Sequence, residues 1–256
     1  MATRIGLEGR EGVSAQEWRL RVDLAACYRI FDHLGWAEMI FNHITVRVPG
    51  PERHFLINPF GLTYREVAAS NLVKIDLEGR PVGRAQYPVN PAGFVIHSAI
   101  HAAREDAHCV MHTHTTNGLA VACKERGLAH DNFYGAQLWG RVAYHDFEGI
   151  TVHAEEKPRL LASIGDKPLA ILRHHGLLAL GPTIEQAFFD LWTLQRACDV
   201  QCAADALAGA TAPLPQAVIE KTARDCAAFD PTGRTPRLVF DAMVRRVAAI
   251  DPSFRN

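Results

Sequence analysis

Histidine is the residue type whose number and spacing in this chain point to chemistry. The chain holds 13 histidines in 256 residues, and His112 and His114 follow the apolar run 109–111, which predicts a buried strand. Side chains two apart in a strand face the same side, so the two imidazoles could place two nitrogens about 2.1 Å from one metal ion. A histidine can equally be a hydrogen-bonded core residue, so the pair alone leaves both interpretations open.

A second histidine pair, His174 and His175, stands directly before Gly176. The apolar run before the pair predicts a strand, and glycine permits the tight turn that would hold a histidine at the strand's end. Adjacent side chains of an extended segment face opposite ways, so we expect only one of the two to join His112 and His114. Three neutral imidazoles with an open fourth position are typical of a catalytic zinc site.

Two other groups of residues compete for a metal. His97 and His101 are four apart on a predicted helix, but the glutamate of the HExxH motif is missing, and packing or hydrogen bonding is the more usual role of such a pair. The six cysteines form no CxxC motif and no disulfide ladder, which favours reduced, mostly buried thiols. Cys198 and Cys202 lack a matching Cys or His pair at zinc-site spacing.

Capping signals and hydrophobic periodicity predict the elements that would position the histidines. Ser14 and Glu17 form a capping box at the start of a helix that should stop at Gly35. Helices are predicted over residues 14–34, 91–104, 116–125, 155–164, 183–209 and 238–250, and strands over 43–48, 54–59, 71–76, 108–115, 141–146 and 168–173. Their alternation is typical of an α/β sandwich, in which helices cover a central sheet.

The length and composition favour one main domain with an appendage. We expect a flexible tail over residues 1–13, the domain over 14–209, and a linker and helical extension over 210–256 that packs on the domain or on a neighbouring subunit.

The charge balance argues against nucleic acid and membranes as partners and favours small molecules or proteins. The 27 Lys and Arg match 28 Asp and Glu, so no overall field would attract the chain to a polyanion. The N-terminus has no apolar signal core, and no run of 18 apolar residues occurs. These features predict a soluble, cytoplasmic protein.

The order of four motifs resembles that of the class II aldolase/adducin family. They are NHITVRV (42–48), VNPAGFVIHSAIHAAR (89–104), HCVMHTHT (108–115) and ILRHHGLLALG (171–181). The resemblance covers roughly residues 15–207 and is greater to the adducin heads than to the sugar-phosphate aldolases. It implies a three-layer αβα fold with a mainly antiparallel or mixed sheet, and a homotetramer with sites at subunit interfaces.

The resemblance also implies a divalent metal, most often Zn²⁺, with Mn²⁺ or Fe²⁺ as alternatives. Its ligands would be the equivalents of His112, His114 and His175, the last from an Asn-His-Gly motif in which His174 replaces the Asn here.

Two departures from the sugar-phosphate aldolases bear on function. Gly93 occupies the position of their acid/base glutamate, while Asn42 and Gly61 keep their substrate-binding positions. The positions expected to carry hydroxyls are Phe60, Pro91 and Ala92. A bound phosphate would lose several charge-assisted bonds, each of about 1.5–3 kcal/mol. The sequence therefore argues against a phosphorylated sugar as substrate.

These features lead to the hypothesis of a metal-dependent carbon–carbon lyase, acting by retro-aldol cleavage or decarboxylation on a non-phosphorylated hydroxy- or keto-acid. The candidates for the missing acid/base are His43, His174, Tyr134 and Tyr144, each of which is more often a packing or surface residue. Arg47 and Arg173 are candidates to bind a substrate carboxylate.

Two rival functions stay open. Three histidines also suit an epimerase, or an oxygenase if iron is the metal. The other rival is a non-enzymatic binding module like the adducin head, which also lacks the glutamate. The complete histidine triad, which leaves a coordination position open on the metal, favours a catalytic function over a binding module.

Overall fold

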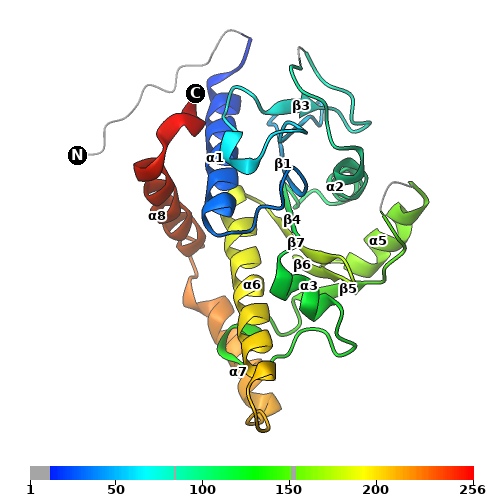
Figure 1. Cartoon of the computed structure of the whole chain (residues 1–256), viewed down its shortest axis with the longest axis vertical. Coiled ribbons are helices and arrows are strands. Elements are labelled where there is room, and N and C mark those ends of the chain that lie inside the picture. The colour runs from blue at the N-terminus through cyan, green and yellow to red at the C-terminus, as the bar shows by residue number, and fades with distance from the viewer. Residues whose placement is uncertain (1–11, 84, 151–153) are drawn as a thin grey trace.

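A seven-stranded sheet with helices on both faces forms the centre of the molecule (Figure 1). The computed structural model describes residues 12–83, 85–150 and 154–256. The strands are β1 (His43–Arg47), β2 (Phe55–Ile57), β3 (Val73–Ile75), β4 (Cys109–Thr113), β5 (Val142–His145), β6 (Leu169–Leu172) and β7 (Gly176–Gly181). Their order is β3-β2-β1-β4-β7-β6-β5, and every neighbouring pair is antiparallel except β5 with β6. The predicted three-layer αβα fold with a mainly antiparallel, mixed sheet is confirmed.

Two helical layers cover the two faces of the sheet. The helices are α1 (Ala15–His33), α2 (Pro91–Ala103), α3 (Thr116–Ala122), α4 (Phe133–Gln137), α5 (Lys157–Ile164), α6 (Ile184–Ala206), α7 (Gln216–Phe229) and α8 (Thr235–Ile250), with short 3-10 turns at η1 (Tyr64–Glu66), η2 (Ala154–Glu156) and η3 (Pro252–Arg255). In β4, Met111 packs into the apolar cluster of α1, α3 and α6, and Val110 packs into that of α2 and α5. Because both faces are covered, β4 is apolar without alternation until its histidines.

The predicted first helix is present and begins at the predicted cap. The Ser14 hydroxyl accepts a hydrogen bond from the Glu17 backbone N–H at 3.1 Å. The Glu17 carboxylate does not close the capping box; it binds Arg21 Nε at 2.9 Å and Lys74 Nζ at 2.8 Å. This nearly buried ion cluster ties α1 to β3.

The segment around the second histidine pair differs from the extended strand that we expected. Residues 173–175 form a turn between β6 and β7, and His174 has a positive φ of 55°. The run GLLALG after the turn is a strand that we did not predict, because a short apolar run without alternation carries no clear period. The turn brings His175 beside the end of β4, since β7 is the neighbour of β4.

The C-terminal helix α8 packs on α1 and α6 of the same chain (Figure 1). Its Phe240 and Val247 are buried, and the Arg29 guanidinium of α1 binds the Asp251 carboxylate at 2.6 Å. Helix α7, which we did not predict, contacts α4. The domain boundaries at 13/14 and 209/210 stay predictions, and residues 1–11 of the expected tail lie outside the described residues.

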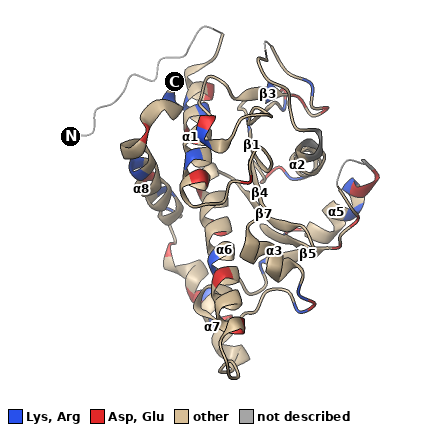
Figure 2. Cartoon of the chain, in the orientation of Figure 1, with Lys and Arg blue, Asp and Glu red and all other residues tan. Residues whose placement is uncertain are grey.

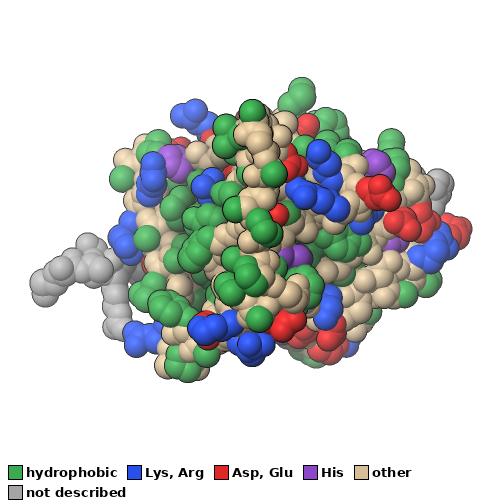
Figure 3. Space-filling model, turned by 90° about the horizontal axis from the view of Figure 1, so that it is seen from below, with side chains coloured by type: hydrophobic (Ala, Val, Ile, Leu, Met, Phe, Trp, Pro, Cys, Tyr) green, Lys and Arg blue, Asp and Glu red, His purple; other side chains and the backbone are tan. Residues whose placement is uncertain are grey.

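Charges of both signs are scattered over the helices and loops (Figure 2). Seen from below, hydrophobic side chains gather near the centre of the face, with charged groups of both signs around them (Figure 3). In the part of the chain that the structure describes, no helix has the length and apolar character needed to cross a membrane.

Candidate metal centre

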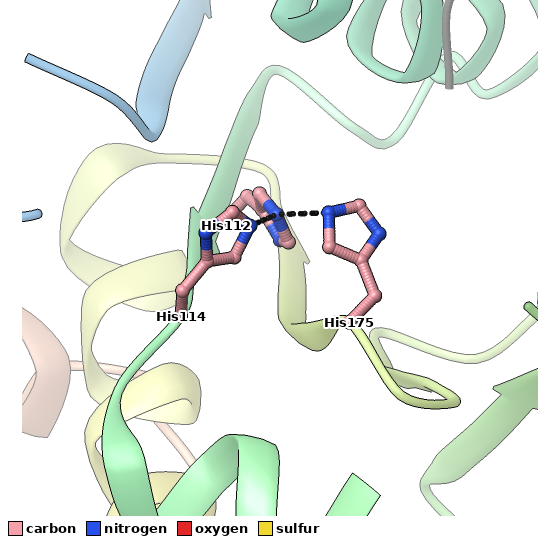
Figure 4. A group of neighbouring side chains, drawn as sticks. All are labelled: His112, His114 and His175. Carbon is pink, nitrogen blue, oxygen red and sulfur yellow. Dashed lines mark hydrogen bonds between the residues drawn. The ribbon is translucent and has the colours of Figure 1, made fainter. Parts of the chain in front are cut away.

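Three imidazoles converge beside the end of β4 (Figure 4). His112 is on β4, His114 follows two residues later, and His175 belongs to the turn before β7. The Nε2 atom of His112 lies 2.8 Å from that of His114 and 3.3 Å from that of His175. Nitrogens about 2.1 Å from a tetrahedral ion are about 3.4 Å apart. The three side chains therefore fit around one small divalent ion with little movement.

Hydrogen bonding sets the tautomer of His112 that a metal ligand needs. Its Nδ1 lies 2.9 Å from the carbonyl oxygen of Leu177, which can only accept. Nδ1 therefore carries the proton, and the Nε2 lone pair faces the other two rings. The bonded carbonyl also fixes the orientation of the ring, so β7 supports the ligand that β4 carries.

The three imidazoles are neutral at pH 7. Burial lowers the pKa of His112 well below its usual value, and the neighbouring His175, His114 and His43 lower it further. Burial also lowers the pKa of His114, and burial together with the neighbouring His114 lowers the pKa of His175 to about 4. A metal binds neutral imidazole, so no proton has to be removed first.

The three histidines open onto a cavity of about 540 Å³. Its described lining consists of Glu38, Phe41, Asn42, His43, Asn90, Gly93, Ile96, His112, His114, Leu119, Phe147, Gly149, Ile150, His174 and His175. The volume suits a small organic molecule. Of the residues that we predicted for the site, the cavity brings together the three candidate ligands with Asn42, His43, Gly93 and His174.

Asn42 and His43 face the cavity with unused hydrogen-bonding capacity. Both are buried, and the Asn42 amide has no hydrogen-bond partner among the described residues on either its oxygen or its nitrogen. Neither ring nitrogen of His43 makes a well-aligned bond. Burial, reinforced by His114 and His175, lowers the pKa of His43 to about 3, and the nearby Gly93 backbone opposes this only weakly. Unsatisfied buried polar groups in a cavity are typical of a site that binds a ligand.

The His43 ring fills the space next to Gly93 of α2. A Cβ atom built on Gly93 would lie 2.6 Å from His43 Nδ1, which is too close for any real contact. Any side chain at position 93 would therefore clash with the His43 ring where it now lies. The absence of a side chain at position 93 thus leaves room for the His43 imidazole.

The pair His97 and His101 is part of the core. Both rings are buried and bond to the Thr45 hydroxyl, at 2.7 Å each. His101 Nδ1 also lies 2.9 Å from the Ala107 carbonyl. Among the described residues, which include Cys198 and Cys202, the triad is the one group of three or more potential metal ligands close enough to share an ion.

Three of the predicted site residues lie elsewhere. The Tyr144 hydroxyl accepts a bond from the Leu128 N–H at 3.0 Å. The Tyr134 ring packs on Trp192, with ring centres 5.8 Å apart. Gly61 is in an exposed turn with a φ of 104°. None of the three lines the cavity.

The two candidate carboxylate-binding arginines also have other partners. Arg47 pairs with Glu105 at 2.8 Å, and Arg173 donates to the Lys124 carbonyl at 2.6 Å while it covers the Tyr144 ring. Neither lines the cavity.

Sequence reasoning missed the apolar residues of the cavity, chiefly Phe41, Ile96, Leu119 and Phe147. The one signal was their position beside matched or predicted segments: Phe41 precedes the motif NHITVRV, and Phe147 follows the predicted strand 141–146.

The family model described as Class II Aldolase and Adducin N-terminal domain matches residues 22–202. The chain belongs to this family. A solved aldolase II superfamily protein from Pseudomonas syringae is 42% identical to this class II aldolase/adducin chain, with a TM-score of 0.89 over 95% of this chain and 98% of that one. Alpha-adducin of Rattus norvegicus is 48% identical over 193 residues, which are 74% of this chain and 26% of the adducin.

A structure named L-fuculose 1-phosphate aldolase, from Glaciozyma antarctica, has a TM-score of 0.82 and 29% identity, over 100% of this chain and 97% of that one. The family therefore includes both aldolases and adducin heads among the proteins similar to this chain.

Proposed function

We propose that this protein is a metal-dependent carbon–carbon lyase that cleaves or decarboxylates a non-phosphorylated hydroxy- or keto-acid. The observation that carries the proposal is the convergence of three neutral imidazoles on one cavity, with their Nε2 atoms within reach of a single ion. Bound there, a divalent ion such as Zn²⁺, with Mn²⁺ or Fe²⁺ as alternatives, would polarise a substrate oxygen.

Two side chains beside the triad are assigned to the substrate. The Asn42 amide has a free donor and a free acceptor, which suits a hydroxyl or carboxyl group of the substrate. The His43 ring fills the space beside Gly93, the position at which the resemblance expects the acid/base glutamate, so we assign to His43 the movement of the proton. His174, exposed at the cavity, is the second candidate. Tyr134 and Tyr144 are not carried into this proposal, because their contacts lie outside the cavity.

The charge of the cavity supports a substrate without phosphate. No Lys or Arg is among the described lining residues, and Glu38 is the charged side chain that contributes to the wall. A phosphate dianion in the cavity would lose its hydration without gaining a Lys or Arg partner for its charges, which is costly.

Metal content and turnover test the proposal. We expect about one metal ion per chain in the purified protein and in His108→Ala, an exposed control just before β4. His112→Ala should lose both the metal and the cleavage of hydroxy- or keto-acids, because one of three ligands is removed. Full metal content without any carbon–carbon cleavage across a panel of such acids would reject the lyase, and oxygen uptake with bound iron would assign the site to an oxygenase instead.

A non-enzymatic binding module is the second candidate, favoured by the 48% identity to alpha-adducin. It predicts no turnover, and capture of a protein partner that His112→Ala leaves unchanged.

We further propose a homotetramer in the cytoplasm, on the resemblance described above. Light scattering of the purified protein tests the assembly, and a monomer mass would reject it.

A further inference from the structure

Apolar side chains open to solvent gather at the cavity of the histidine triad. Phe41, Phe147 and Ile150 are 47%, 51% and 79% exposed, and all three line this cavity. Ile96 and Leu119, which are more buried, add to the same lining. Exposed apolar residues scattered singly need no explanation, but a group of them around one cavity is typical of a binding surface.

This apolar wall begins next to the candidate metal ligands. The centre of the Phe147 ring lies 6.4 Å from that of His175 and 6.3 Å from that of His174. A molecule held by its oxygens at the triad would therefore place its next few carbon atoms against Phe147. The polar and apolar parts of the cavity can serve one small ligand.

In the described part of its lining, the wall offers no Lys or Arg partner for a second anionic group. Glu38 is the charged residue of the described lining, and it would repel an anion. The guanidinium of Arg173, close in sequence to the triad, donates to the Lys124 carbonyl and covers the Tyr144 ring, and it does not line this cavity. A carboxylate at the triad would be neutralised by the ion there, but a charge at the far end of the ligand would not.

Resting on the proposed function, we infer that the substrate is a hydroxy- or keto-acid whose carbon chain ends in an uncharged apolar group, aryl or branched alkyl. Its oxygen-bearing end lies at the triad, and its apolar group lies against Phe41 and Phe147. These two side chains select the substrate.

Calorimetric titration of the zinc-loaded protein with racemic mandelate and with glycerate tests the inference without turnover. Both are small 2-hydroxy acids with the same oxygen-bearing end, and they differ by a phenyl against a hydroxymethyl group. We expect mandelate to bind at least about tenfold more tightly, because the phenyl group leaves water for an apolar wall.

Variants of the two phenylalanines test whether they cause the preference for mandelate. Phe147→Ala should weaken the binding of mandelate by about fivefold and change the affinity for glycerate by less than about twofold. Phe41→Ala should act in the same direction. As a control, Phe229→Ala removes an 80% exposed phenylalanine from α7, outside the cavity. It should leave the affinity for both acids unchanged. Because Phe41 and Phe147 are about half exposed, their loss should not impair folding.

Several results would overturn the inference. These are equal affinity for the two acids, equal losses for both in Phe147→Ala, or no binding of either acid. Unchanged mandelate binding by His112→Ala would show that the triad does not hold the acid, and this would also overturn the inference. A changed oligomeric state of Phe147→Ala with unchanged mandelate affinity would assign the wall to a subunit contact. A preserved preference for mandelate without any turnover would reject the lyase and keep the inference about the ligand.

Discussion

Gly176 approaches Thr113 so closely that no side chain fits between the two strands. A Cβ atom built on Gly176 would lie 2.2 Å from the Thr113 carbonyl oxygen and 3.1 Å from His114 Cδ2. The turn that carries His175 can thus reach β4 only because residue 176 is glycine. A local backbone requirement thereby places the third imidazole beside the first two.

Gly176→Ala should therefore cost the protein its metal. The added methyl must push the turn away from β4, and a displacement of about 1 Å is enough to spoil coordination distances that tolerate about 0.2 Å. Metal content after dialysis measures the effect. The matched control is Gly135→Ala in α4, where a Cβ would also lie 2.2 Å from a carbonyl oxygen, that of Ala129. Both variants should lose about 1–3 kcal/mol of stability, and retention of metal by Gly176→Ala would contradict the prediction.

Gly93→Ala should lower activity without removing the metal. Its methyl group would overlap the buried His43 ring, which has to move from its place at the cavity. If His43 moves the proton, kcat/KM should fall by about 10²-fold or more. The zinc content should match that of the unaltered protein, and a variant with full activity would remove His43 from the mechanism.

Metal removal should destabilise the fold, because the candidate ligands join β4 to the turn between β6 and β7. A chelator should lower the Tm by roughly 5–10 °C, and zinc should restore it. His112→Ala serves as the control, since its Tm should not respond to the chelator. An unchanged Tm in the original protein would argue against a resident metal.

Asp23→Asn should stabilise the protein at pH 8 but not at pH 3.5. Burial raises the pKa of Asp23 from 3.8 to about 6, Arg237 opposes the shift, and Glu185 and Asp241 add to it. Between pH 3.8 and about pH 6, Asp23 is ionised in the unfolded chain but still protonated in the folded one. The free energy of unfolding therefore falls as the pH rises through this range, and the loss is complete above about pH 6. The gain at pH 8 should be about 1–3 kcal/mol.

Urea unfolding of the Asp23 variant at the two pH values measures this difference. Asp225→Asn, on the exposed surface of α7, should change stability by less than about 0.5 kcal/mol at either pH. An equal gain for Asp23→Asn at both pH values would show that its charge is not responsible.

Features that depend on neighbours along the chain were predictable from sequence. Ser14 caps α1 because its hydroxyl needs only the backbone of Glu17, three residues later. The strand period of two placed His112 and His114 on one side, and the structure brings their Nε2 atoms within 2.8 Å. The five-residue helix α4 and strand β7 were missed, because short segments carry too few periods to distinguish them from loops.

The sequence by itself determined the family, the sandwich fold and the histidines that were candidates for a metal, because motif order, caps and periodicity are written in consecutive residues. It left open which of His174 and His175 joins the pair; the resemblance selected His175, and the turn with His174 at positive φ carries it there. Only the tertiary structure decided that His43 takes the space beside Gly93, and that Phe41 and Phe147 share a cavity. Such contacts depend on the order and register of strands far apart in the chain, which no local pattern encodes.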